Sequence, residues 1–141
     1  MVDAELIKQL IELRDKEKRE AKDALTLFGI YKELVKDIEE VKEELDDMDE
    51  IIIQNNYTDA DFKYWVKLGN GKFDVGQGEA SDPSVIMNAD TETWSGLGSG
   101  DIDATSAYMA GDLSIEGNLQ DAMAYGEVLD LIRDFIEDLE E

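Results

Sequence analysis

The spacing of apolar residues changes near residue 50 of this 141-residue chain, and that change most constrains the fold. Before it, apolar or small residues recur every three or four positions, the spacing that lines one face of a helix. They are Leu6, Leu10, Leu13, Ala24, Leu27, Tyr31, Leu34, Ile38, Val41, Leu45 and Met48. Glu17 and Glu20 break this face, and Gly29 costs about 1 kcal/mol inside a helix, so we expect two helical segments or one kinked helix. An amphipathic helix packed on its own sheet and a dimeric coiled coil both satisfy the spacing.

Strands and tight turns are predicted after residue 50. Residues 51–57 are rich in β-formers and residues 62–68 alternate between apolar and polar side chains. Gly69-Asn70-Gly71 supplies the positive φ values of a hairpin turn, so 72–79 is the returning strand. Further strands are predicted at 84–89, after the turn that holds the only proline, and at 113–116.

Two short helices are indicated between the last two strands, and a final helix follows the last strand. Asp90, Asp103 and Asn118 each stand where a polar side chain caps a helix N-terminus, and Gly111 suits a left-handed C-terminal position. The helix that follows Asn118 carries apolar residues on a face wider than one contact with a sheet requires.

The composition excludes several classes of function. The chain has no Cys and no His, which removes disulfides, thiolate nucleophiles, histidine bases and ordinary zinc sites. The formal net charge is −23, and no cation lies between Lys72 and Arg133, so neither nucleic acid nor an anionic membrane is an expected partner. Plain solubility or a salty cytoplasm explains the acidity as well as any functional reason does. Apolar runs such as 51–53 are too short to span a membrane, and no secretory segment follows Met1, so we expect a soluble, cytoplasmic protein.

Local motifs for nucleotides or metals fail on their spacing. Gly76 and Gly78 lack the third glycine of a dinucleotide fingerprint, and the glycines of 96–100 are not followed by Lys-Ser or Lys-Thr. The alternating oxygens of Asn88, Asp90 and Glu92 lack the glycine and the final glutamate of a calcium loop. We therefore expect no metal, no cofactor and no catalytic residues.

The order of the predicted elements from about Phe28 to Leu131 resembles the sterol carrier protein domain, also called the nonspecific lipid-transfer domain. The most specific block, from Gly100 to Met123, is similar to the family pattern at Ala107, Tyr108, Met109, Gly111, Leu113, Ile115, Gly117, Asn118, Ala122 and Met123. Two acidic residues, Asp112 and Glu116, stand where members often carry lysines, which weakens a membrane-docking role.

This resemblance implies an α+β fold in which helices cover one face of a five-stranded, mostly antiparallel sheet. Residues 1–26 would form a helical N-terminal extension, and residues 27–141 the lipid-binding domain. The family has an apolar tunnel between sheet and helices for a lipid-like ligand. The residues expected to line it are Trp65, Trp94, Tyr108, Met109, Leu119, Met123, Tyr125, Leu129 and Ile132. If Met123 faces the ligand, replacing it by lysine should abolish binding.

The expected function is noncatalytic binding and transport of a hydrophobic ligand. The alternative is an interaction or accessory module that dimerises or docks on an enzyme through its N-terminal helices and presents lipophilic substrates. The stripe formed by Leu6, Leu10 and Leu13 is too short for a stable free helix, so it must pack on its own domain or on a second copy in a homodimer. The stretch without cations predicts that the ligand is uncharged or keeps any anionic head group in water, because an unpaired buried charge costs roughly several kcal/mol.

Overall fold

The change of apolar period near residue 50 coincides with the start of a sheet in the computed structural model, which describes residues 4–16 and 20–140. The helices of this part of the chain are α1 (Ala4–Arg14), α2 (Ala21–Leu34), α3 (Glu39–Asp47), α4 (Thr91–Ser99), α5 (Ala104–Ala110) and α6 (Leu119–Glu140), with a 3-10 turn at Val35–Asp37. The strands are β1 (Ile51–Tyr57), β2 (Lys63–Gly69), β3 (Lys72–Gln77), β4 (Val85–Ala89) and β5 (Ser114–Gly117).

The strands form a five-stranded sheet in the order β3-β2-β1-β4-β5. β1 and β4 are parallel, and every other pair in this sheet is antiparallel, which confirms the expected mostly antiparallel arrangement. The predicted hairpin turn joins β2 to β3, and all three of its residues, Gly69, Asn70 and Gly71, have positive φ. Only Gly fits at position 69, because a Cβ there would meet the backbone of Asp49.

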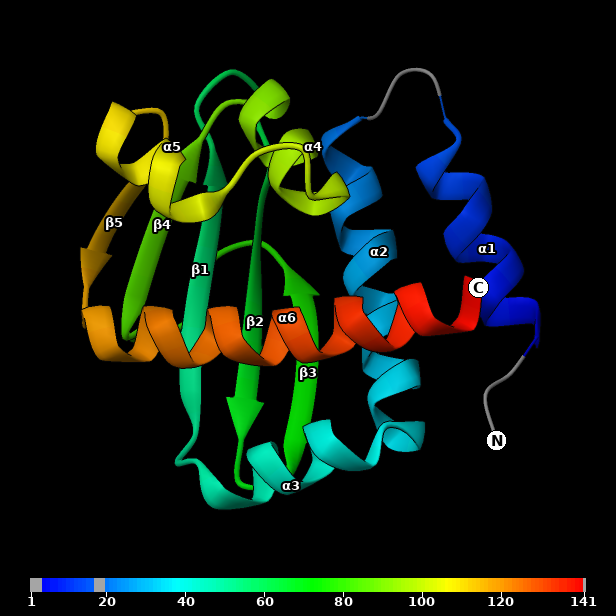
Figure 1. Ribbon diagram of the computed structural model, residues 1–141. Coiled ribbons are helices and arrows are strands. Elements are labelled where there is room, and N and C mark those ends of the chain that lie inside the picture. The colour runs from blue at the N-terminus through cyan, green and yellow to red at the C-terminus, as the bar shows by residue number, and fades with distance from the viewer. Residues whose placement is uncertain (1–3, 17–19, 141) are drawn as a thin grey trace.

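Helices cover one face of the sheet, as expected (Figure 1). The long helix α6 crosses the strands, with α2 and α3 beside it. Alternate residues of β1 and β2 point toward this layer, and Ile53, Tyr64 and Val66 are buried there. Trp65 lies on the opposite face, where its ring occupies the space that a side chain on Gly76 would need.

The predicted helix caps are all present. Asp90 accepts a hydrogen bond from the Thr93 N–H at 2.8 Å, and Asp103 accepts one from the Ser106 N–H at 3.0 Å. Asn118 accepts one from the Asp121 N–H at 3.2 Å, and Gly111 has φ of 86°. These short-range bonds fix where α4, α5 and α6 begin, and therefore how they sit above the sheet.

The N-terminal helices pack on the rest of the chain. Glu20 and Asp23 form a capping box at the start of α2, which continues through Gly29 without a break because Phe28, Ile30 and Tyr31 are all buried. The interruption predicted at Glu17 lies outside the described residues. α1 packs on α2, and Leu10 is only 2% exposed within its own chain. The predicted boundary between residues 26 and 27 falls inside α2, and the division into extension and domain stays a prediction.

No helix in the described part of the chain is both long enough and apolar enough to cross a membrane.

Candidate functional site

A cavity of about 820 Å³ lies between the helices and the sheet. Its wall is built by α1, α2, α4, α5 and α6 together with β1, β2, β4 and β5. This volume is in the range that small-molecule sites occupy. Tyr108, Leu119 and Met123 line the cavity and are also exposed, so it opens to solvent beside α5 and the start of α6.

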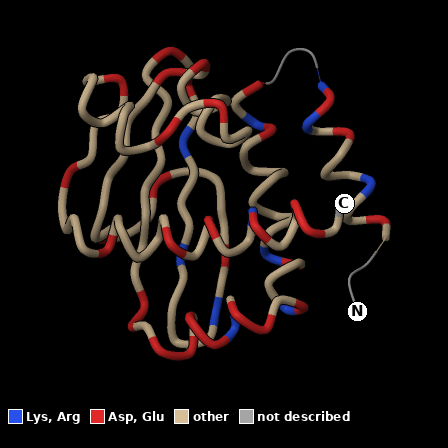
Figure 2. Tube along the Cα trace, in the orientation of Figure 1, with Lys and Arg blue, Asp and Glu red and all other residues tan. Residues whose placement is uncertain are grey.

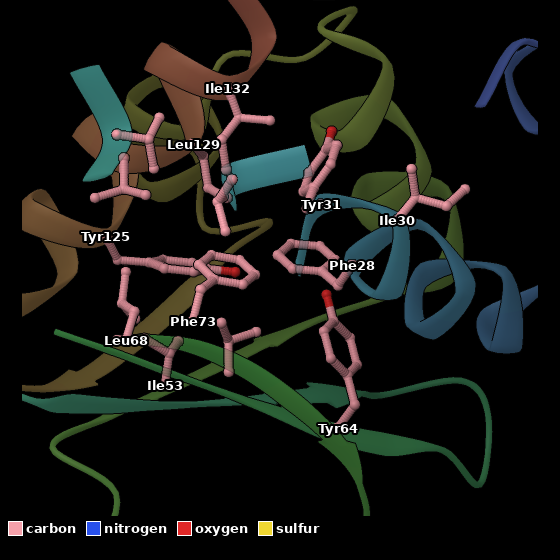
Figure 3. Packing of buried hydrophobic residues seen from close by; sticks show 14 of the residues in the cluster. Phe28, Ile30, Tyr31, Ile53, Tyr64, Leu68, Phe73, Tyr125, Leu129 and Ile132 are labelled. Atoms are coloured by element: carbon pink, nitrogen blue, oxygen red, sulfur yellow. The ribbon is translucent and has the colours of Figure 1, made fainter. Parts of the chain in front are cut away.

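Aromatic rings form the inner part of the wall (Figure 3). The Phe28 ring of α2 stacks near Tyr125 of α6, with centroids 6.5 Å apart and planes at 20°. The centroid of the Phe28 ring also lies 5.2 Å from that of Tyr31 and 5.5 Å from that of Tyr64 on β2. All four side chains are buried and line the cavity, so this end is apolar except for the tyrosine hydroxyls.

A polar side chain lies beside these tyrosines. Asn55 of β1 is completely buried, and its Nδ2 donates a hydrogen bond to Tyr125 Oη at 3.4 Å. Its Oδ1 has no hydrogen-bond partner within the described part of the chain. Burial raises the pKa of both Tyr64 and Tyr125 far above the ordinary value, so both hydroxyls stay protonated and uncharged.

Charged side chains also stand along the wall, and carboxylates outnumber guanidinium groups. The cations are Arg14 and Arg133, and the carboxylates belong to Glu20, Asp23, Asp103, Glu127, Asp130, Asp134 and Glu137. Burial acts to raise the pKa of Asp23, but hydrogen bonds from the Glu20 backbone and from Lys16 outweigh it and lower the pKa. Arg133 Nη1 lies 3.7 Å from Asp130 Oδ1.

The absence of cations between Lys72 and Arg133 led us to expect no cation at the ligand, but two arginines line the cavity. The stretch between Lys72 and Arg133 does lack cations, but α1 and the end of α6 meet at the cavity and bring Arg14 and Arg133 to its wall. Sequence spacing cannot reveal this, because the two residues are far apart in the chain.

Most of the residues expected to line a tunnel share this cavity. Those on its wall are Trp94, Tyr108, Leu119, Met123, Tyr125 and Leu129. Trp94 is held over β1 by a hydrogen bond of 3.0 Å from Nε1 to the Asn56 carbonyl, and its ring lies 5.9 Å from Tyr57. Contact between these residues and a ligand is a prediction.

Three of the expected residues lie elsewhere. Trp65 is on the other face of the sheet, because neighbouring strand residues alternate and Tyr64 takes the inner face. Met109 is 80% exposed and is not on the cavity wall, and Ile132 is fully buried in the core behind it.

Sequence reasoning missed part of the wall. Leu10, Tyr31, Tyr64 and Met87 line the cavity, although the sequence assigned them only to a helix face or a strand, and Phe28 lines it without having been assigned to either. The helical spacing of the N-terminal segment and the alternation in 62–68 indicated that they are buried, but not that they face a cavity. No group of three or more metal-ligating side chains occurs within residues 4–16 and 20–140.

Comparison with known proteins connects this fold to one family. The model of the SCP-2 sterol transfer family matches residues 31–130. A direct comparison with curated proteins gives no match.

Solved structures share the fold at low sequence identity. Sterol carrier protein 2 from Yarrowia lipolytica, in its apo form, has a TM-score of 0.61 and 20% identity, covering 81% of this chain and 95% of its own. A structure described as UbiJ-SCP2 ubiquinone synthesis protein has a TM-score of 0.60 and 15% identity, covering 83% and 97%. The inverting sec-alkylsulfatase Pisa1 from Pseudomonas sp. has a TM-score of 0.56 and 14% identity, and the match covers 72% of this chain but 16% of that enzyme.

Proposed function

Because the chain belongs to the SCP-2 sterol transfer family, we propose that it binds a hydrophobic, lipid-like ligand reversibly in the cavity and carries it without chemical change. The observation that carries this proposal is the cavity itself, whose inner wall is made of Phe28, Met87, Leu129 and tyrosine rings. Burying alkyl surface against such a wall stabilises a complex by roughly 25 cal/mol per Å². Binding of this kind needs no catalytic group, and the protein releases the ligand unchanged.

The charges on the wall favour an uncharged ligand. Arg14 and Arg133 stand among seven carboxylates, so an anionic head group would meet more repulsion than attraction. Transferring a charge out of water without a partner costs several kcal/mol, roughly. Acyl esters, alcohols and isoprenoids should therefore bind more tightly than ionised fatty acids.

A displacement experiment tests both statements. The full chain is loaded with a fluorescent apolar probe and titrated at neutral pH with methyl dodecanoate and with dodecanoate, which differ in the head group. We expect the ester to displace the probe at lower concentration than the carboxylate. Failure of every lipid to displace or bind would contradict the carrier function, and tighter binding of the carboxylate would contradict the preference for an uncharged ligand.

A second function is favoured by the exposed apolar residues near the cavity opening. Tyr108, Met109, Leu119 and Met123 are exposed on α5 and α6, where a partner could dock and receive a ligand. The likeness to the ubiquinone synthesis protein is consistent with an accessory role of this kind. Exchange of bound fluorescent lipid with vesicles distinguishes the two functions: a carrier transfers lipid unaided, whereas an accessory module retains it until its partner enzyme is added.

A further inference from the structure

The exposed apolar side chains of this protein gather at the cavity opening. Six large apolar residues of the described part of the chain are exposed, and four of them belong to α5 and the first turns of α6. These four are Tyr108, Met109, Leu119 and Met123, which we call the mouth patch. Single exposed apolar side chains need no explanation, whereas a group of them marks an interaction site.

The mouth patch borders the opening from two helices. Leu119 and Met123 are four residues apart on α6, so they lie on the same side of that helix. Tyr108 lines the same cavity from α5. Methionine is unbranched and adapts its shape to a partner, and an opening between two helices accommodates the apolar face of a third.

Carboxylates surround the mouth patch, and no cation lies among them. From Asp90 to Asp130 the sequence has nine carboxylates and no Lys or Arg, and the charged residues around α5 and β5 in Figure 2 are all acidic. Asp103 caps α5 and lines the cavity, Glu127 lines it one turn after Met123, and Asp112 follows α5. We call Asp103, Asp112 and Glu127 the mouth carboxylates.

The mouth carboxylates have no cationic partner of their own. All three residues are exposed, and none of them takes part in an ion pair within the described part of the chain. A positively charged group from another molecule can therefore approach them without displacing an internal partner.

We propose that the mouth patch and the mouth carboxylates together dock a basic amphipathic helix of a partner protein. The apolar face of this helix packs on Tyr108, Leu119 and Met123, and lysines or arginines beside that face pair with the mouth carboxylates. This inference rests on the accessory function proposed above and adds the chemistry of the partner. The docked helix covers the opening, so it also controls when a ligand leaves the cavity.

Other occupants satisfy only part of this surface. A second copy of the chain would bring the same carboxylates against one another, and an anionic membrane would be repelled by them. A zwitterionic membrane could cover the apolar side chains but has no net positive charge for the mouth carboxylates. A helix with an apolar face and basic flanks complements both sets of residues.

Binding of labelled peptides to the lipid-free full chain, measured by fluorescence anisotropy at about 100 mM sodium chloride, tests the proposal. The probe is a peptide of about 18 leucines and lysines in which the leucines form one face of a helix. A second peptide has the same composition, but its leucines are spread around the helix. We expect the first peptide to bind about tenfold more tightly, because the charges are equal and only the first can bury its leucines together.

A pair of apolar variants locates the bound peptide. Leu119→Ser combined with Met123→Ser should weaken binding of the first peptide about tenfold, because the apolar contact is lost. The matched control combines Ile11→Ser with Leu139→Ser, which removes two exposed apolar side chains that are not on the cavity wall. Its affinity for the peptide should stay within about twofold of that of the unchanged protein.

A pair of charge variants tests the mouth carboxylates independently. Asp103→Asn, Asp112→Asn and Glu127→Gln are combined, and asparagine at position 103 retains the cap of α5. This variant should bind the first peptide about fivefold more weakly. The control removes the same charge from α3, which is not on the cavity wall, and should change the affinity by less than about twofold. Its substitutions are Glu40→Gln, Glu43→Gln and Asp47→Asn.

The outcomes separate this inference from ligand binding. Equal binding of the two peptides, or equal losses in the mouth variants and their controls, would mean that net charge alone attracts the peptide and would overturn the inference. Zwitterionic vesicles or a second copy bound through Leu119 and Met123, in place of the peptide, would also overturn it. If the peptide docks as expected but no lipid displaces a fluorescent probe, ligand binding fails and the docking site stands.

Discussion

Met123 and Leu129 both line the cavity, yet their surroundings predict different responses to the same substitution. Met123 is 67% exposed, whereas Leu129 is 7% exposed, and both lie on α6. The loss of binding expected from sequence for Met123→Lys assumes an enclosed side chain. With this much exposure, a lysine can place its ammonium group in water and its alkyl stem on the wall.

We therefore predict that Met123→Lys weakens ligand binding by less than about tenfold and changes stability by less than about 0.5 kcal/mol. Leu129→Lys should abolish binding and destabilise the fold by several kcal/mol, roughly, because its charge has no path to water. Probe displacement measures binding, and urea unfolding with circular dichroism measures stability. Equal effects of the two substitutions would mean that exposure does not decide their roles.

The buried tyrosines predict a loss of stability in alkaline solution. Burial raises the pKa of Tyr64 and Tyr125 in the folded chain, while an unfolded tyrosine ionises near pH 10, roughly. Above that pH the unfolded chain has lost these protons and the folded chain still holds them, so ionisation favours unfolding. The free energy of unfolding should therefore be constant to about pH 9 and fall steeply by about pH 11.

Urea unfolding across this range checks the prediction, with Tyr64→Phe and Tyr125→Phe combined as the control. Between about pH 9 and about pH 11, the free energy of unfolding of the control should fall less than that of the unchanged chain. An identical pH dependence would assign the alkaline loss to other groups.

At the scale of elements, the features set by neighbouring residues were predictable and those set by distant ones were not. The caps at Asp90, Asp103 and Asn118 depend on bonds that reach three residues along the chain, so their sequence signals were sufficient. The inner face of β2 depends on which side the helices cover, and the pattern alone could not place Tyr64 rather than Trp65 on it. The share of α1 in the cavity wall depends on how α1 folds back on α2 and on the position of α6 at the same cavity, which no local pattern encodes.

The helix α1 provides the next prediction, because Leu10 and Leu13 contribute to the wall of the cavity. Deleting residues 1–19 removes α1 but preserves the capping box of Glu20 and Asp23, whereas a deletion to residue 26 would remove the first turns of α2. We expect the shorter deletion to fold, with unchanged strand content, and to release bound probe faster than the full chain. Stopped-flow fluorescence measures the release. A release rate identical to that of the full chain would show that α1 does not close the cavity.

The homodimer remains a separate prediction at this scale. Leu10 is buried within its own chain, so it is not available to a dimer seam in this arrangement. Sedimentation at high micromolar concentration distinguishes the cases, since a monomeric full chain rules the dimer out.

At the scale of the whole molecule, charge is distributed unevenly (Figure 2). Lys and Arg lie on β2, β3, the N-terminal helices and, as Arg133, on α6, whereas the charged residues around α5 and β5 are all Asp or Glu. With a net charge of −23, carboxylates repel one another in the compact state more than in the expanded one. Screening by salt should reduce this repulsion.

We predict that the Tm rises by about 4 °C or more between about 20 mM and about 500 mM sodium chloride, which corresponds to about 1 kcal/mol. Differential scanning fluorimetry provides the measurement, and an uncharged osmolyte of matched osmolarity is the control. A Tm that falls or stays constant with salt would mean that ion pairs such as Lys32–Asp74, at 2.8 Å, outweigh the repulsion.

The central claim is that the cavity between sheet and helices holds an uncharged lipid. Native mass spectrometry of the full chain, after incubation with a total lipid extract, tests it most directly, with Leu129→Lys as the comparison. The account predicts one lipid per chain, uncharged when extracted and identified, and none on the folded Leu129→Lys variant. A chain that emerges without lipid, or a lipid retained equally by that variant, would contradict it.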